Sequence, residues 1–139
     1  MNLTEQAIRT LKDFFSDMNK WETYWYNLKN ENPNMDYKSE QKKEIDTIYA
    51  KYLTHKERKL GRQVSLSTRF PSTFCPSDEI IGCELSSDNK KISIEVQQKF
   101  KTGVERKFRY KLILKNNEWR VDRREMFDSY DNKWIKDNL

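Results

Sequence analysis

The fold is decided by residues 90–128, KKISIEVQQKFKTGVERKFRYKLILKNNEWRVDRREMFD, in which apolar and polar side chains alternate along successive runs. Because alternate side chains of a strand point to the same face, one face is apolar and the other is charged. The apolar face holds Ile92, Ile94, Val96, Phe100, Phe108, Tyr110, Leu112 and Leu114. The pairs at 88–89, 102–103 and 116–117 tolerate the left-handed backbone of tight hairpin loops. The pattern predicts a three-stranded antiparallel meander.

Two helices are predicted before the meander. Asn2-Leu3-Thr4-Glu5 resembles a capping box, and apolar residues then recur at three- and four-residue spacing to about Leu28, before Asn32-Pro33-Asn34 breaks the pattern. A second amphipathic helix is predicted from Tyr37 to about Leu53, and the basic residues after it suit a helix end near Gly61. The predicted core residues are Phe14, Trp21, Trp25, Tyr110 and Trp119.

The remaining segments are shorter. Residues 64–67 are predicted as a short strand, residues 79–85 as a longer one, and residues 129–139 as a short terminal helix. The loop 70–76 is irregular because Pro71 and Pro76 exclude a regular element. Two helices and a strongly curved antiparallel sheet bury the most apolar surface when the helices lie in the concave face of the sheet. We therefore expect a single α+β domain, residues 1–139, shaped like a cone.

Composition limits the class of protein. The chain has 139 residues, enough for one domain, and its 13% aromatic content offsets a charged fraction of 35%. No apolar run reaches the ~20 residues of a membrane span, and the first residues lack a secretory signal, so we expect a cytoplasmic protein without membrane contact. Cys75 and Cys83 make no disulfide framework, and the one histidine makes no metal set. We expect no metal and no cofactor.

Short motifs are spread along nearly the whole chain. They are FFSDMNKWE at 14–22, RKLGR at 58–62, Phe70-Pro71 with Phe74 and Pro76, RYKL at 109–112, EWRVD at 118–122 and NKW at 132–134. With them the chain resembles the nuclear transport factor two-like superfamily, and more closely its bacterial immunity-protein branch from polymorphic toxin systems. The Trp-Arg-Val-Asp strand is common to the superfamily. Its combination with Trp21-Glu22, Gly61-Arg62 and a terminal Trp134 is more specific.

The resemblance implies a nuclear transport factor two-like cone and a function as an immunity protein. Such a protein binds a cognate bacterial toxin domain stoichiometrically, neutralises it, and protects the producing cell and its kin. The resemblance implies no catalysis, and the chemistry of the toxin does not follow from the fold. Sheets of this superfamily often pair through their outer faces, which makes a homodimer possible, but a face rich in Lys and Arg favours a monomer.

The superfamily that the chain resembles also includes small isomerases and dehydratases. A small-molecule-binding or enzymatic function is therefore the alternative. Such enzymes need an acid or base inside the cone, where desolvation moves its pKa toward neutrality. The predicted inward strand positions are instead apolar or aromatic. His55 lies in a charged stretch, and Asp122 faces outward without a partner at nucleophile or metal-ligand spacing. The residues therefore favour a filled cone and a protein that is not an enzyme.

Two surfaces are candidates for toxin binding. The outward face of the sheet is predominantly basic and includes Lys107, Arg109 and Arg124; it would complement an acidic patch, or serve only to keep the sheet soluble. The second surface is the rim of the cone, where Gln98, Arg106 and Arg123 take inward positions near strand ends and the two arginines are expected to be neighbours. Arginines there suit the carboxylates of a partner.

Aromatic residues near the rim are expected to anchor the interface, because aromatic and Arg side chains dominate binding energy. They are Phe70, Phe74, Phe127, Tyr130 and Trp134. Nucleic-acid binding is not favoured. It would need Tyr110 or Trp119 to face outward and stack on bases, whereas the strand alternation points both inward.

Overall fold

The computed structural model describes residues 1–139, which form three helices and then five strands. The helices are α1 (Leu3–Glu31), α2 (Lys38–Tyr52) and α3 (Arg62–Ser65), and the strands are β1 (Glu79–Leu85), β2 (Lys91–Lys99), β3 (Glu105–Lys115), β4 (Glu118–Asp128) and β5 (Lys133–Asp137). Neighbouring strands are antiparallel, in the order β1-β2-β3-β4-β5. The predicted meander, the two long helices and the strand at 79–85 are confirmed.

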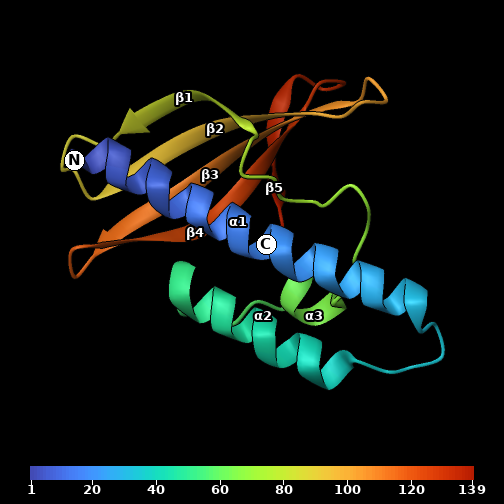
Figure 1. The fold of residues 1–139 in the computed structure, drawn as a ribbon. Coiled ribbons are helices and arrows are strands. Elements are labelled where there is room, and N and C mark those ends of the chain that lie inside the picture. Colours follow the sequence, from blue (N-terminus) through green and yellow to red (C-terminus); the bar gives the residue numbers. More distant parts are fainter.

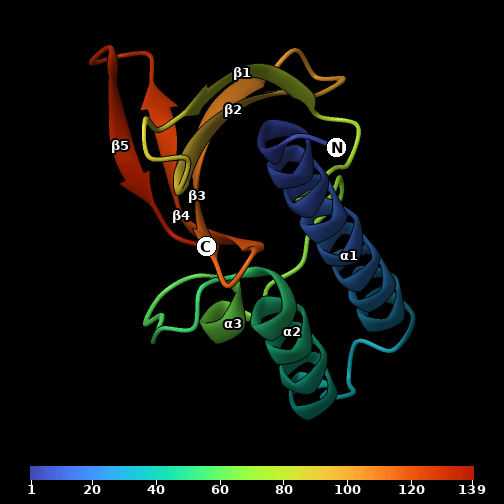
Figure 2. The same ribbon diagram turned by 90° about the vertical axis from the view of Figure 1, so that its left-hand side faces the viewer.

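The curved sheet holds α1 in its concave face (Figure 1). Figure 2 shows β1, β2 and β3 curling around the N-terminal half of α1, while α2 lies beside its C-terminal half. The start of α1 is a reciprocal cap: the Glu5 N–H donates to Asn2 Oδ1 at 2.8 Å, and Asn2 Nδ2 donates to Glu5 Oε1 at 3.2 Å. None of the helices is both long enough and apolar enough to cross a membrane.

Aromatic side chains build most of the core between the helices and the sheet. The predicted core residues Phe14, Trp21, Trp25, Tyr110 and Trp119 are each at most 5% exposed. Ring centroids lie 5.3 Å apart for Phe14 and Phe74, and 5.2 Å apart for Phe15 and Tyr110. Edge-to-face pairs of this kind contribute about 0.5–1.5 kcal/mol beyond the burial of area. The cone is filled, and its larger hollows open at the surface.

The prediction near Gly61 was wrong. Residues 62–65 form α3 where a strand at 64–67 was predicted, and α2 ends at Tyr52, close to the predicted end at Leu53, so Gly61 does not end it. Gly61 has φ +110°, and a Cβ on it would lie 1.7 Å from the carbonyl oxygen of Leu139. Only glycine fits this backbone and this close approach. Gly61 therefore opens α3 against the last residue of the chain instead of ending α2.

The terminal segment was also predicted incorrectly, because residues 133–137 form β5 and not a helix. β5 pairs with β4 after a turn in which Asn132 has φ +55°. Ile135 lies opposite Met126 on the inner face, and Trp134 lies opposite Phe127 on the outer face. The two apolar residues are adjacent in sequence and serve opposite faces, which a strand allows.

A β-bulge in β4 decides which arginine faces the core. Lys111 of β3 lies opposite Arg123, but Leu112 lies opposite Val121, so Asp122 is an extra residue in β4. One extra residue reverses the face of the side chains that follow. Arg124 therefore points inward and is 7% exposed, whereas Arg123 points outward. The sequence-based assignment of these two arginines was the reverse.

Candidate functional site

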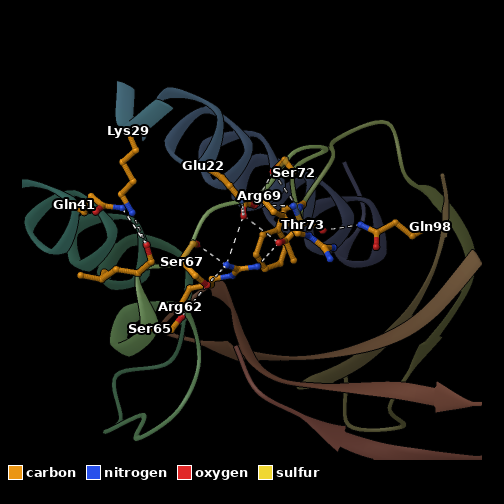
Figure 3. A network of polar contacts seen from close by, with 12 residues as sticks. Glu22, Lys29, Gln41, Arg62, Ser65, Ser67, Arg69, Ser72, Thr73 and Gln98 are labelled. Carbon is orange, nitrogen blue, oxygen red and sulfur yellow. Dashed lines mark hydrogen bonds and ion pairs between the residues drawn. The ribbon is translucent and has the colours of Figure 1, made fainter. Parts of the chain in front are cut away.

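Glu22 of α1 holds the loop 66–76 from the inside (Figure 3). Its carboxylate is 1% exposed and accepts hydrogen bonds from the backbone N–H groups of Arg69, at 3.1 Å, and Thr73, at 2.7 Å. The Ser72 hydroxyl donates to it at 2.9 Å, and the Arg62 guanidinium lies 3.6 Å away as counter-charge. A buried carboxylate needs such partners to offset its desolvation. The motifs Trp21-Glu22 and Gly61-Arg62 thus form a loop anchor.

Gln98 and Phe74 fix the far end of this loop. Gln98 Nε2 donates to the Thr73 carbonyl at 2.6 Å and to Asp78 Oδ2 at 3.0 Å, and its residue is 4% exposed. Phe74 is 2% exposed, and its carbonyl accepts a hydrogen bond from Asn19 Nδ2 at 2.8 Å. Both residues were expected to contact the toxin. In this structure both are buried and position the loop from below, and their contact with a toxin stays a prediction.

The motif Trp119-Arg120-Val121-Asp122 ties the end of α2 to β4. Trp119 and Val121 are buried, while Arg120 Nη1 donates to three carbonyls at residues 50, 51 and 53, which the helix end leaves free. Asp122 Oδ1 accepts from Thr54 Oγ1 at 2.8 Å and from Lys56 Nζ at 3.0 Å. Burial opposes ionisation of Asp122, but these hydrogen bonds outweigh it and lower the pKa of the carboxyl. This motif is structural.

The outer side of the anchored loop borders a groove, here called the rim groove, with a volume of about 540 Å³. It is lined by Arg69, Phe70, Pro71, Lys99, Phe100, Lys101, Thr102, Val104 and Arg106. Phe70 is 73% exposed and Val104 is 49% exposed, so apolar surface is open to solvent here. Of the rim residues predicted as contacts, Arg106 lies in this groove. Phe100, which was expected in the core, lines it as well.

The rim groove carries positive charge that the protein does not neutralise. Its charged residues are Arg69, Lys99, Lys101 and Arg106, and none of them forms an ion pair. The guanidinium carbons of Arg69 and Arg106 each lie 5.8 Å from the centroid of the Phe100 ring. Arg69 Nε and Nη2 are buried without a hydrogen-bond partner. Burial, and next the charge of Arg106, lower the pKa of Arg69.

The outer face of the sheet brings together four other predicted contact residues. Arg109 lies over the Trp134 ring at 4.4 Å, and Lys107 lies over the Phe127 ring at 4.8 Å. The Phe127 and Trp134 rings meet edge to face with centroids 5.3 Å apart. Arg109 also binds Glu125 at 2.9 Å. The cations of this cluster are thus already engaged with rings or acids of the protein itself.

Arg123 joins neither cluster. It lies opposite Lys111 on the outer face, whereas Arg106 lies opposite Gln98 at the other end of β3. The expected neighbourhood of Arg106 and Arg123 is therefore absent. Sequence reasoning also missed Arg69. Two of its guanidinium nitrogens are buried without a hydrogen-bond partner, and the sequence gives no sign of this.

Arg124 is the charged group that the bulge turns into the cone. Its Nη1 donates to the Tyr110 hydroxyl at 3.3 Å, and its Nη2 lies 2.6 Å from Asp137 Oδ2. Burial raises the pKa of Tyr110, and the charge of Arg124 only partly opposes this. An arginine keeps its proton at neutral pH, so the pair offers no group that exchanges protons there. No cluster of three or more His, Cys, Asp and Glu residues could hold a metal ion.

Comparison with known proteins accounts for the fold and the motifs together. The sequence profile described as NTF2 fold immunity protein matches residues 6–138. The chain belongs to this family. The immunity protein RhsIA of Dickeya dadantii (strain 3937) is 42% identical to it over 139 residues, covering 100% of both chains. No solved structure matches the chain. Membership of the NTF2 fold immunity protein family confirms the resemblance that the motifs carry. It also shows that this protein has an immunity function.

Proposed function

We propose that this immunity protein neutralises a cognate bacterial toxin domain by stoichiometric protein–protein binding, as a single non-enzymatic domain. The observation that carries the proposal is the rim groove, which exposes Phe70 and Val104 beside four cations without ion pairs. Aromatic and Arg side chains dominate the energy of protein interfaces. Such a surface lowers its free energy by docking a partner that covers the apolar groups and supplies negative charge.

The filled cone supports a binding protein over an enzyme. The charged group turned into it, Arg124, is held by Asp137 and Tyr110 and stays protonated at neutral pH. Tyr110 and Trp119 are buried, so they offer no stacking platform for nucleic-acid bases. We further propose that the protein acts as a monomer in the cytoplasm and needs no cofactor.

The test is a titration of the purified protein with the toxin domain encoded next to it, combined with a growth assay. We expect one-to-one binding by calorimetry and rescue of growth when the two are co-expressed. A toxin domain from an unrelated system is the control and should neither bind nor be neutralised. Absence of binding to the neighbouring toxin domain, with rescue also absent, would overturn the proposed function.

A further inference from the structure

We propose that the rim groove binds an acidic segment of the toxin domain, with a carboxylate held by Arg69 and Arg106 and an apolar side chain packed against Phe70. The inference rests on the proposed function and specifies its contact surface and its partner chemistry. It selects the groove over the outer sheet face, where Lys107, Arg109 and Trp134 lie.

The first argument is the convergence of two unpaired guanidinium groups. Arg69 comes from the loop and Arg106 from β3, yet both lie 5.8 Å from the centroid of the same Phe100 ring. Neither forms an ion pair, and Arg69 Nε and Nη2 have no hydrogen-bond partner. Besides burial, the charge of Arg106 lowers the pKa of Arg69, so the two like charges repel each other, and a carboxylate bound in the groove would offset this repulsion. The planar fork of the exposed Arg106 matches the geometry of a carboxylate, and Arg69, whose Nε and Nη2 are covered, adds its charge.

The second argument is that the nearest buried acid is already committed elsewhere. Glu22 binds the backbone N–H of Arg69, and its counter-charge is Arg62. The Arg69 side chain therefore receives no ion pair from the residue that anchors its own backbone. The charge of Glu22 still acts on Arg69 from a distance, but an ion pair in contact with Arg69 would have to come from a partner.

The third argument is that the groove has an apolar centre with a charged edge. Phe70 is 73% exposed, and its ring rests on Tyr26 with the centroids 6.1 Å apart, so one side of the ring is supported and the other is open. Val104 adds apolar surface at the same groove and is 49% exposed. A buried apolar centre ringed by polar contacts is the common arrangement of protein interfaces. A single-stranded nucleic acid would also use the cations and would stack a base on Phe70, so the second measurement below distinguishes it from a protein segment.

The fourth argument is preorganisation. The loop that presents Arg69 and Phe70 is fixed before any partner arrives, through its hydrogen bonds to Glu22 and through the bond from Gln98 to the Thr73 carbonyl. Ordering a mobile loop on binding costs affinity, and a loop that is already ordered avoids that cost. The free protein thus holds the groove in a shape ready for its partner.

The experiment compares Arg106→Glu and Arg69→Glu with Arg123→Glu by calorimetric titration against the neighbouring toxin domain. Arg123 is the matched control because it is exposed on the outer face and its substitution changes the net charge equally. We expect each groove variant to weaken Kd by about 30-fold or more, the range of an interface hot spot, and the control to change it by less than about threefold. Unchanged melting temperatures would verify that all variants fold.

A second measurement uses a fluorescein-labelled 20-nucleotide single-stranded DNA as probe. We expect no binding at physiological salt, since the proposal assigns the groove to a protein segment. If wild-type protein bound this probe, Arg106→Glu abolished that binding, and toxin affinity stayed unchanged, the groove would be a nucleic-acid site and the proposal would fail. Equal loss of toxin affinity in the groove and control variants would also overturn it, while leaving the proposed function intact. Loss of the function itself would appear as no binding by the wild type.

Discussion

The rim groove and the outer face of the sheet are both rich in cations, but they use them differently. On the outer face Arg109 is paired with Glu125 and stacked on Trp134, and charges of opposite sign alternate along the row Glu95, Arg109, Glu125 and Lys136. In the groove the cations have no acidic partner and surround exposed apolar groups. The number of Lys and Arg residues therefore does not identify a binding surface. What identifies it is whether their charge is neutralised within the chain.

The largest expected effect comes from breaking the anchor under the groove. Glu22→Ala removes the counter-charge of Arg62 and leaves the loop donors of Arg69, Ser72 and Thr73 without their acceptor, which should destabilise the protein by about 3–5 kcal/mol. Glu125→Ala on the outer face is the matched control, because its half-buried ion pair with Arg109 lies at the surface, where such pairs contribute about 1 kcal/mol or less. Urea denaturation monitored by tryptophan fluorescence measures both. Similar losses for the two variants would refute the assignment of Glu22 as the anchor.

Two aromatic truncations sharpen the comparison at the level of binding. Phe70→Ala should weaken toxin binding by about 2 kcal/mol with little loss of stability, because its ring is exposed in the free protein and is covered by the toxin under the proposal above. Trp134→Ala should leave the affinity nearly unchanged, because Trp134 lies on the outer face beneath Arg109. Calorimetric titration of both variants checks the prediction. The reverse order of effects would move the interface to the outer face.

A smaller effect is expected when the outer cluster loses its central cation. Arg109→Ala removes the contact with Trp134 and the ion pair with Glu125, each worth about 0.5–1 kcal/mol at an exposed site. The free energy of unfolding should fall by about 1 kcal/mol, while toxin affinity stays the same. Denaturation and titration of the same preparation separate the two quantities. A variant as stable as wild type would mean that the cluster contributes nothing to folding.

The smallest effect concerns pH. Burial opposes ionisation of Glu125, but the hydrogen bond and charge of Arg109 lower the pKa of this carboxyl below its ordinary value of 4.5. A lowered pKa in the folded state stabilises the protein above the ordinary value, and this contribution disappears as the pH falls through the lowered one. The urea midpoint of Glu125→Gln should therefore fall less than that of the wild type between about pH 5 and pH 3, the range in which carboxyl groups ordinarily titrate. Parallel curves for the two proteins would contradict this.

The parts of the fold that follow from local pattern were predictable. Alternation along 90–128 and helical spacing along 3–28 place the meander and α1, since both patterns depend only on neighbouring residues. The bulge at Asp122 was not predictable, because its flanking residues alternate acceptably with or without the extra residue. The bulge exchanges the predicted faces of Arg123 and Arg124. As a result, the predicted neighbourhood of Arg106 and Arg123 does not form. β5 was missed because five residues are too few to distinguish a strand from a helix by periodicity.

The candidate site was predictable only in part, for a related reason. Arg106 and Phe70 were identified because they lie at a strand end and in a proline-containing loop, both visible in the sequence. Phe74 lies in the same loop and is buried, and the sequence does not separate the two rings. Arg69 was missed because its value to a partner depends on the absence of an ion pair, which is a property of the folded molecule.

Two of the four hydrogen bonds that Glu22 accepts from its loop come from backbone N–H groups, at Arg69 and at Thr73. These donors exist whatever side chain the residue carries, so Arg69 and Phe70 can be replaced without releasing the loop. The conformation of the loop therefore depends little on the side chains at residues 69 and 70, whereas the surface of the rim groove depends on them directly. Under the proposal that the rim groove binds the toxin, substitutions at residues 69 and 70 change the partner while the loop keeps its shape, which makes these residues the positions to randomise when engineering mutually exclusive toxin–immunity pairs.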